Sequence, residues 1–239
     1  MIRRTMDATF LNTVANDPTV RPFIGGDGES VIDLGPQLAD PRNVALETEH
    51  GGWVLFYLAP GEWNLHTMFL KSGRGRFYRK ASAEALRWMF TRTDCTEILT
   101  ECPDGNPAAR MAAVMAGFRE RFVRGETSYQ AFTIDDWIAR DAEALKAGQW
   151  FHERIDEARG LHGVDTHPDD EAHNRAAGTA ILMMREGQIG KGVAVYNRWA
   201  RFAGYAQIAQ VGPHVVDIGD AVIEIVGPDM NVLAVRRPD

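Results

Sequence analysis

The sequence predicts an α+β fold in which a mixed, mostly antiparallel sheet is flanked by helices and followed by a smaller C-terminal α/β appendage. The first observation is the order of elements over the first 140 residues, where β-rich runs precede a helix, a strand, a second helix and further strands. The second is that residues 62–89 have the pattern of a strand that ends in a glycine-rich turn and continues directly into a helix. With 239 residues and 45% hydrophobic content, the chain can bury a sizeable core. We predict one domain over residues 1–140 and, over residues 141–239, a helical segment with the small appendage.

The elements before residue 62 are defined mainly by turn signals. Residues 8–24 suggest a helix that is broken around residues 16–18, and a glycine-rich loop follows. Between residues 44 and 70, three β-rich runs are separated by Gly51-Gly52 and by Pro60-Gly61. This spacing predicts an antiparallel meander.

The third run of the meander alternates polar and apolar side chains, which assigns its two faces. One face carries Leu65, Thr67 and Phe69, and the other carries Asn64, His66 and Met68. Beyond it, the pattern predicts a helix at about 76–92, a strand at 96–102, a helix at 106–116 and a final hairpin-like pair of strands.

The segment KSGRGR, between the strand and the helix, is suited to binding an anion. Gly73 and Gly75 let the backbone turn sharply and bring its N–H groups close to a ligand, because no Cβ stands in the way. The first turn of the following helix adds unpaired N–H groups and the positive end of the helix dipole. Four basic side chains crowd the same place: Arg74, Arg76, Arg79 and Lys80. The sequence therefore predicts a phosphate or pyrophosphate site, and a plain turn with solvated arginines is the alternative.

A second motif follows thirty residues on, in NPAARMAAVMAGF at residues 106–118. Asn106, Ala109, Gly117 and Phe118 fit the pattern N-x-x-A-x(7)-G-F. Together, the strand–turn–helix and this helix resemble motifs A and B of the GNAT superfamily of N-acetyltransferases, over roughly residues 1–140. The segments NDPTVRPFIGG and H-x-MFL-x(3)-RG are similar to those of GNAT-like proteins of tailed bacteriophages.

The resemblance implies an acyl-CoA-dependent N-acyltransferase with acetyl-CoA as the donor. In the resembled fold, the strands at 62–70 and 96–102 diverge, and the cofactor lies in that opening. The expected cofactor-binding groups are the backbone of Met68, Phe69 and Leu70 for the pantetheine, then Gly73, Arg74, Gly75 and Arg76 for the pyrophosphate, and Asn106 beside the pantetheine.

The acid–base candidates are His66 and Glu62, which are in phase on the polar face of one strand. An imidazole titrates near the working pH, and a carboxylate can take a proton through water, so either can deprotonate an amine acceptor. A structural histidine and a solvated glutamate are the alternatives for the two residues. Two positions depart from the resembled family: Leu70 stands where Gln or Arg is usual, and Ala113 stands where many members have a Tyr that acts as general acid.

These departures leave a second function class open: a GNAT-like structural or regulatory protein of a phage or virion that has lost catalysis. The net charge of −7 and the pI near 5.5 argue against nucleic acid as a partner. No apolar run reaches the ~18 residues of a membrane span, so no membrane partner is expected. The chain has two cysteines and no CxxC motif, which indicates a reducing compartment such as the cytoplasm. If the chain is phage-encoded, this would be the cytoplasm of the host cell, and a location in the virion is the alternative. The expected partners are a CoA ester and a small amine or protein acceptor, and a homodimer or virion assembly stays open.

The patterns in the second half of the chain predict secondary structure and packing rather than a catalytic or metal site. Helical spacing continues from residue 135 and again over 167–188, and the stretch 194–205 has aromatic residues that suggest a core stripe against residues 215–226. The letters HPDDE at 167–171 also occur in zinc-dependent sugar de-N-acetylases. A helix start with Thr166 as N-cap explains them better, so we predict no metal site.

Overall fold

The computed structural model describes residues 2–25, 30–140, 144–149, 171–203, 207–217, 221–226 and 231–236. The backbone divides into two compact units. The first comprises Met1–Trp88 and Cys95–Ile134, and the second comprises Met89–Asp94 and Asp135–Asp239. That residues 1–140 fold as a domain of their own stays a prediction.

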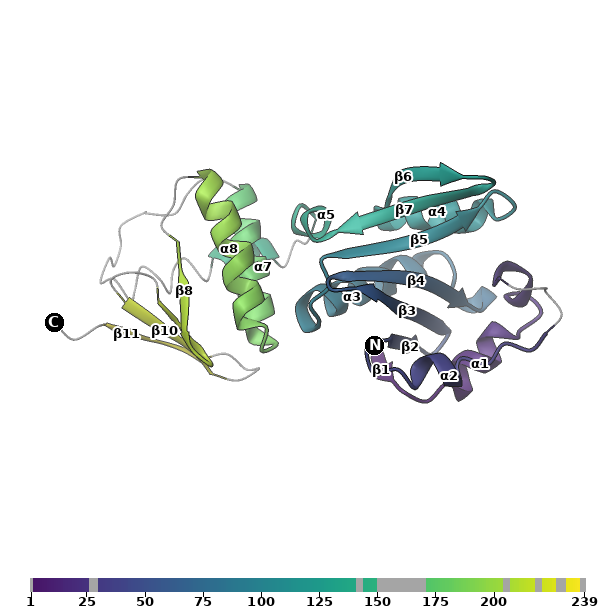
Figure 1. The fold of residues 1–239 in the computed structure, drawn as a ribbon, viewed down its shortest axis with the longest axis horizontal. Coiled ribbons are helices and arrows are strands. Elements are labelled where there is room, and N and C mark those ends of the chain that lie inside the picture. Colours follow the sequence, from purple (N-terminus) through teal and green to yellow (C-terminus); the bar gives the residue numbers. More distant parts are fainter. Residues whose placement is uncertain are drawn as a thin grey trace. The chain divides into compact units, whose positions relative to one another are not determined.

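The first unit is built on a seven-stranded sheet in the order β1-β2-β3-β4-β5-β7-β6 (Figure 1). All neighbouring strands are antiparallel except β4 and β5, which are parallel. The predicted class, an α+β fold with a mixed and mostly antiparallel sheet, is confirmed. The strands are β1 Arg3–Thr5, β2 Val44–Thr48, β3 Gly51–Ala59, β4 Glu62–Phe69, β5 Glu97–Pro103, β6 Arg119–Arg124 and β7 Thr127–Thr133.

Helices lie on both faces of this sheet. On one face, α1 (Thr9–Ala15) and α2 (Gly35–Leu38) bury Leu11, Val14 and Leu38 against Val54 and Met68. On the other face, α3 (Arg76–Arg92) packs Tyr78 near Trp53 and Phe69, with ring centroids 6.3 and 5.3 Å apart. Figure 1 shows α3 and α4 (Pro107–Ala116) behind the sheet. Short 3-10 turns are η1 (Arg21–Phe23) and η2 (Lys71–Gly73).

Most predicted elements of this unit are confirmed. The α4 helix, for example, begins with Pro107 and is capped by Gly117, which has a φ of 101°. Three details differ. The sequence reasoning missed β1 and α2, which are too short to show a periodic pattern. The prediction that Gly51-Gly52 forms a turn was wrong, since both residues begin β3. A Cβ at Gly52 would run into the β2 backbone, so this glycine allows two strands to approach.

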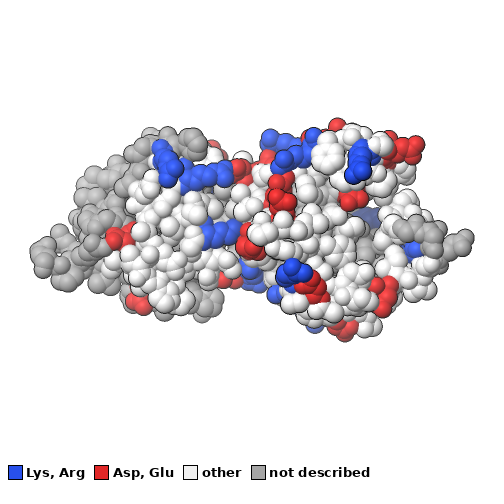
Figure 2. All heavy atoms as spheres, viewed as in Figure 1, with Lys and Arg blue, Asp and Glu red and all other residues white. Residues whose placement is uncertain are grey.

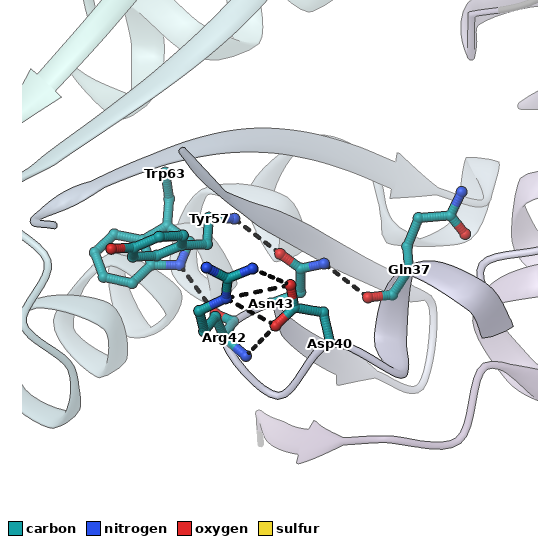
Figure 3. A network of polar contacts seen from close by, with 6 residues as sticks. All are labelled: Gln37, Asp40, Arg42, Asn43, Tyr57 and Trp63. Atoms are coloured by element: carbon teal, nitrogen blue, oxygen red, sulfur yellow. Dashed lines mark hydrogen bonds and ion pairs between the residues drawn. The ribbon is translucent and has the colours of Figure 1, made fainter. Parts of the chain in front are cut away.

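A polar network fixes the first residues of β4 (Figure 3). Asn43 accepts a hydrogen bond from the Tyr57 N–H at 2.8 Å and donates from Nδ2 to the carbonyl of Gln37 at 2.7 Å. The Trp63 indole N–H donates to the carbonyl of Arg42 at 3.3 Å, and its ring meets Tyr57 edge-on at 5.4 Å. These contacts hold the end of β4 at which it pairs with β5.

The second unit combines helices with a small sheet. Residues 144–149 are helical and lie against α7 (Glu171–Arg185), and a cluster of buried residues including Ala180, Ile181 and Tyr196 joins α7 to α8 (Ile189–Ala203). The sheet order is β11-β10-β9-β8, all antiparallel. Its strands are β8 Ala209–Gly212, β9 Val215–Asp217, β10 Ala221–Val226 and β11 Asn231–Arg236, and α5 Ile134–Ile138 precedes α7 along the chain.

Several expectations for this half concern residues outside the described ones. The HPDDE segment falls there up to residue 170, and Glu171 is the first residue of α7. Within the described ranges, no helix has both the length and the apolar character to cross a membrane. The same ranges hold no group of three or more His, Cys, Asp or Glu that could hold a metal ion.

Candidate active site

Strands β4 and β5 run side by side over only three residue pairs and then diverge. Glu62 pairs with Glu97, Trp63 with Ile98 and Asn64 with Leu99. One step further, the Thr100 hydroxyl donates to the carbonyl of Leu65 at 3.0 Å, and no described strand pairs with that side of β4 beyond it. The divergence expected from the resemblance is therefore present. The surface is hollowed at this place in the space-filling view (Figure 2).

The open end of β4 leads through η2 into α3. The two glycines of this turn, Gly73 and Gly75, are required for different structural reasons. Gly73 is buried, and a Cβ there would lie 2.5 Å from the Cβ of His50 and 2.8 Å from Cδ1 of Phe69. Gly75 has a φ of +75°, which favours glycine, and nothing lies within 4 Å of its Cβ position. Its carbonyl accepts the Arg79 N–H at 3.2 Å, so it directly precedes α3. The first N–H groups of α3 thus start beside an open glycine.

The basic side chains of this turn differ in what they contact. Arg74 donates from Nη2 to the carbonyl of Thr19 at 2.7 Å and from Nε to the carbonyl of Phe69 at 3.2 Å. It therefore ties the turn to the loop after α1 and to the end of β4. Arg76 and Arg79 are exposed, and the first turn of α3 contains no acidic residue. The helix dipole and these cations together favour an anion here.

His66 lies on the face of β4 that α1 and α2 partly cover. Its ring is 5.0 Å from the ring of Phe56. Burial lowers the pKa of His66 below its ordinary value, and the charge of Glu101 partly opposes that shift. At neutral pH the imidazole is therefore neutral and able to accept a proton.

Glu101 and Asn64 complete a polar group with His66 at the point where the strands part. The Asn64 amide donates to Oε1 of Glu101 at 3.3 Å. Oδ1 of Asn64 is buried, and within the described part of the chain it has no hydrogen-bond partner. Sequence reasoning missed Glu101, because TEILTEC reads as a short apolar strand. The available signal was that Glu97, Leu99 and Glu101 alternate with residues of the opposite face.

Glu62 and Asn106 have positions that fit structural roles as well as the expected ones. Glu62 is exposed at the start of β4, where the two strands are still paired. Glu62 lies four positions before His66, which corresponds to roughly 13 Å along a strand. The two side chains are therefore on the same face of β4 but too far apart to act together. Asn106 is the N-cap of α4, and its side chain accepts the Ala109 N–H at 3.0 Å.

Of the three residues expected at the pantetheine, Met68 and Phe69 are buried and leave only their backbone for a ligand. Met68 is 2% exposed within the core under α1, and Phe69 meets Trp53 edge-on at 4.8 Å. The Leu70 N–H already donates to the carbonyl of His50 at 3.0 Å. Ala113 is buried in α4 and supplies no hydroxyl.

The two cysteines do not offer a nucleophile to this site. Cys95 and Cys102 are both buried and form no disulfide. Burial raises the pKa of the Cys102 thiol above its ordinary value, which keeps the thiol protonated at neutral pH. Neither cysteine is therefore a candidate for a catalytic nucleophile.

No family model matches this chain, and no curated protein matches it either. Solved structures that it resembles are acetyltransferases. The spermidine N-acetyltransferase from Vibrio cholerae in complex with CoA and spermine has 15% identity and a TM-score of 0.45, covering 58% of this chain and 97% of that one. The aminoglycoside acetyltransferase AAC(6')-Ib in complex with coenzyme A and kanamycin has 14% identity and a TM-score of 0.47, covering 59% and 99%. Apo FdhC, a nucleotide-linked sugar GNAT, has 14% identity and a TM-score of 0.45, covering 57% and 87%.

Proposed function

We propose that the first unit is an acyl-CoA-dependent N-acyltransferase of the GNAT type, with acetyl-CoA as donor and an amine as acceptor. The observation that carries this proposal is the divergence of two parallel strands next to a glycine turn that opens a helix. Unpaired backbone of β4 lines one side of the opening, and the positive end of α3 lies at its mouth. This combination suits a long ligand with amides along its length and phosphates at one end.

The residues present fit such a ligand in a defined order. The N–H groups that open α3, with Arg76 and Gly75, would hold the pyrophosphate, while Arg74 holds the turn in shape through Thr19 and Phe69. The backbone of β4 beyond Leu65, including the expected Met68 and Phe69, would meet the pantetheine amides. When bound, the thioester supplies an activated acyl group.

The chain's own contribution to chemistry is proton transfer at His66. The neutral imidazole takes a proton from the acceptor, and the freed amine can then attack. No hydroxyl is available at Ala113 to return a proton to the leaving sulfur, so water or another side chain would do so. Loss of one positioned acid typically costs ~10²–10⁴ in rate, and we expect a slow enzyme.

The second candidate is a GNAT-like protein without catalysis, with a structural or regulatory role that includes assembly into a virion. Ala113 and the absence of a polar side chain at Leu70 favour it. Both candidates predict CoA binding if the turn is intact, and only the enzyme predicts release of free thiol with an amine present. Both proposals include a cytoplasmic location.

The first test of the proposal is ligand-dependent stability with two matched glycine variants, and release of free thiol in the presence of an amine then separates the enzyme from the second candidate. Acetyl-CoA at about a hundred times its Kd should raise the free energy of unfolding by about 2.7 kcal/mol, measured as a rise in Tm and checked by calorimetry. Gly75→Asp should abolish that rise, because it sets a carboxylate against the phosphates. Gly125→Asp is the control, since Gly125 also has a positive φ (+58°) and open space around its Cβ, but lies in the turn between β6 and β7. A wild-type chain without any acetyl-CoA-dependent shift, or equal shifts in both variants, would overturn the proposal.

A further inference from the structure

One face of β5 and β7 carries polar and aromatic side chains and has no described helix over it. In Figure 1, α3 and α4 lie behind the sheet, and the near face of β5, β7 and β6 is open among the described elements. Exposure follows the same division at most positions, with Ala131 of the open face, at 4% exposed, as an exception. The face toward α3 and α4 buries Ile98, Cys102 and Phe132 to 1% or less, whereas Glu101 on the open face is exposed and Phe122 is 53% exposed.

Strand register places five polar or aromatic side chains of β4, β5, β7 and β6 on this side of the sheet. Asn64 pairs with Leu99 across β4 and β5, so Asn64, His66 and Glu101 share one side of the sheet. Glu101 pairs with Tyr129 across β5 and β7, and Tyr129 pairs with Phe122 across β7 and β6. The Tyr129 and Phe122 rings are stacked with centroids 4.7 Å apart.

The chemistry of this group matches a cation. Glu101 provides a carboxylate, and Asn64 provides a buried amide oxygen that lacks a partner in the described chain. The stacked rings offer a π face, which attracts an ammonium group. The neighbouring charges on β5 and β6 include Glu97 and Arg121, which pair with each other. A second cationic side chain of β6, Arg119, lies across from Ala131 on the same side.

We propose that Glu101 recognises the acceptor, and that the acceptor enters as a primary aliphatic ammonium over the open face of β5 and β7. This inference rests on the proposed N-acyltransferase and names its substrate class. Glu101 acts as a positioning residue that binds the ammonium beside His66. Glu62 does not fit this role, because it lies roughly 13 Å along β4 from His66.

The resulting reaction balances in protons and bonds. His66 removes one proton from the ammonium and leaves a neutral amine whose nitrogen carries the lone pair. That nitrogen forms a C–N bond with the acyl carbon, the C–S bond breaks, and the sulfur leaves as a thiolate. The amide nitrogen loses a second proton, and the thiolate gains one from water. The net products are the N-acyl amine, the free thiol and one proton.

The first experiment measures recognition without any acyl donor. Butylamine, which is cationic at neutral pH, is titrated into the full chain while the imidazole resonance of His66 is followed by NMR and assigned with His66→Gln. Butanol is the uncharged probe of the same length. The His66 resonance should move saturably with butylamine and stay in place with butanol. Glu101→Gln should weaken the apparent affinity by about tenfold or more, the usual effect of losing a hydrogen bond to a charged group.

Glu126→Gln is the control, because it removes the same charge from the turn between β6 and β7. We expect it to bind butylamine as the wild type does. In turnover with acetyl-CoA, Glu101→Gln should raise the KM for butylamine and leave the Kd for acetyl-CoA unchanged. Wild-type binding that is absent, or that Glu101→Gln and Glu126→Gln weaken equally, overturns the inference. Glu101-dependent butylamine binding without any acetyl-CoA binding would support the inference and overturn only the acyltransfer, so the two failures are distinguishable.

Discussion

Gly73→Ala tests whether the turn that opens α3 depends on close packing. The added methyl group would lie 2.5 Å from the Cβ of His50 and 2.8 Å from Cδ1 of Phe69, both shorter than real Cβ contacts. Phe69 packs against Trp53 and Tyr78, and the Leu70 N–H donates to the carbonyl of His50, so neither neighbour can move freely. Overpacking of a well-packed site costs about 1–3 kcal/mol.

The measurement is the midpoint of thermal unfolding, followed by circular dichroism. For a unit of this size, about 1 kcal/mol corresponds to roughly 4 °C, so Gly73→Ala should lower Tm by about 4–12 °C. The control is Gly105→Ala in the loop between β5 and α4, where nothing lies within 4 Å of the Cβ position. That variant should stay within about 0.5 kcal/mol of the wild type. If Gly73→Ala unfolds at the wild-type temperature, the turn can accommodate a methyl group at this position and the packing argument is refuted.

Two further predictions concern titration and helix packing. Because burial lowers the pKa of His66, the unfolded chain takes up a proton near its ordinary value of about 6.5 while the folded chain does not. Stability should therefore fall as pH drops from about 6.5 through the lowered folded value, and His66→Gln should flatten that loss in chemical denaturation; parallel pH profiles would contradict it. A Cβ at Gly178 of α7 would lie 2.5 Å from the carbonyl carbon of Ala144, so Gly178→Ala should destabilise the second unit by about 1–3 kcal/mol despite the better helix propensity of alanine. Gly190→Ala near the start of α8 meets only the end of the Gln210 side chain and should be close to neutral in the same thermal scan, and equal effects at both positions would argue against a tight crossing.

The fold was largely accessible from sequence, because the signals that define its elements are local. The alternation along β4, the glycine turn before α3, and the Asn106 and Gly117 caps of α4 all act within a few residues of one another. The short β1 and α2 were missed, since three or four residues carry no periodic signal. The glycines at the start of β3 were misassigned to a turn, because the need for them arises from the neighbouring strand.

The features of the candidate site can also be separated into those that local sequence patterns predict and those that depend on tertiary structure. Sequence alone determined that a basic, glycine-rich turn joins a strand to a helix, and that His66 lies on the polar side of that strand. Only the tertiary structure decided that β5 runs parallel to β4 for three pairs and then departs, which brings Glu101 beside Asn64 and leaves Glu62 at the paired end. Likewise, only the packing of His50 against the turn makes Gly73 necessary. The physical reason is that strand register and close packing join residues 20 to 40 positions apart, and such contacts depend on how whole elements fit together rather than on any local pattern.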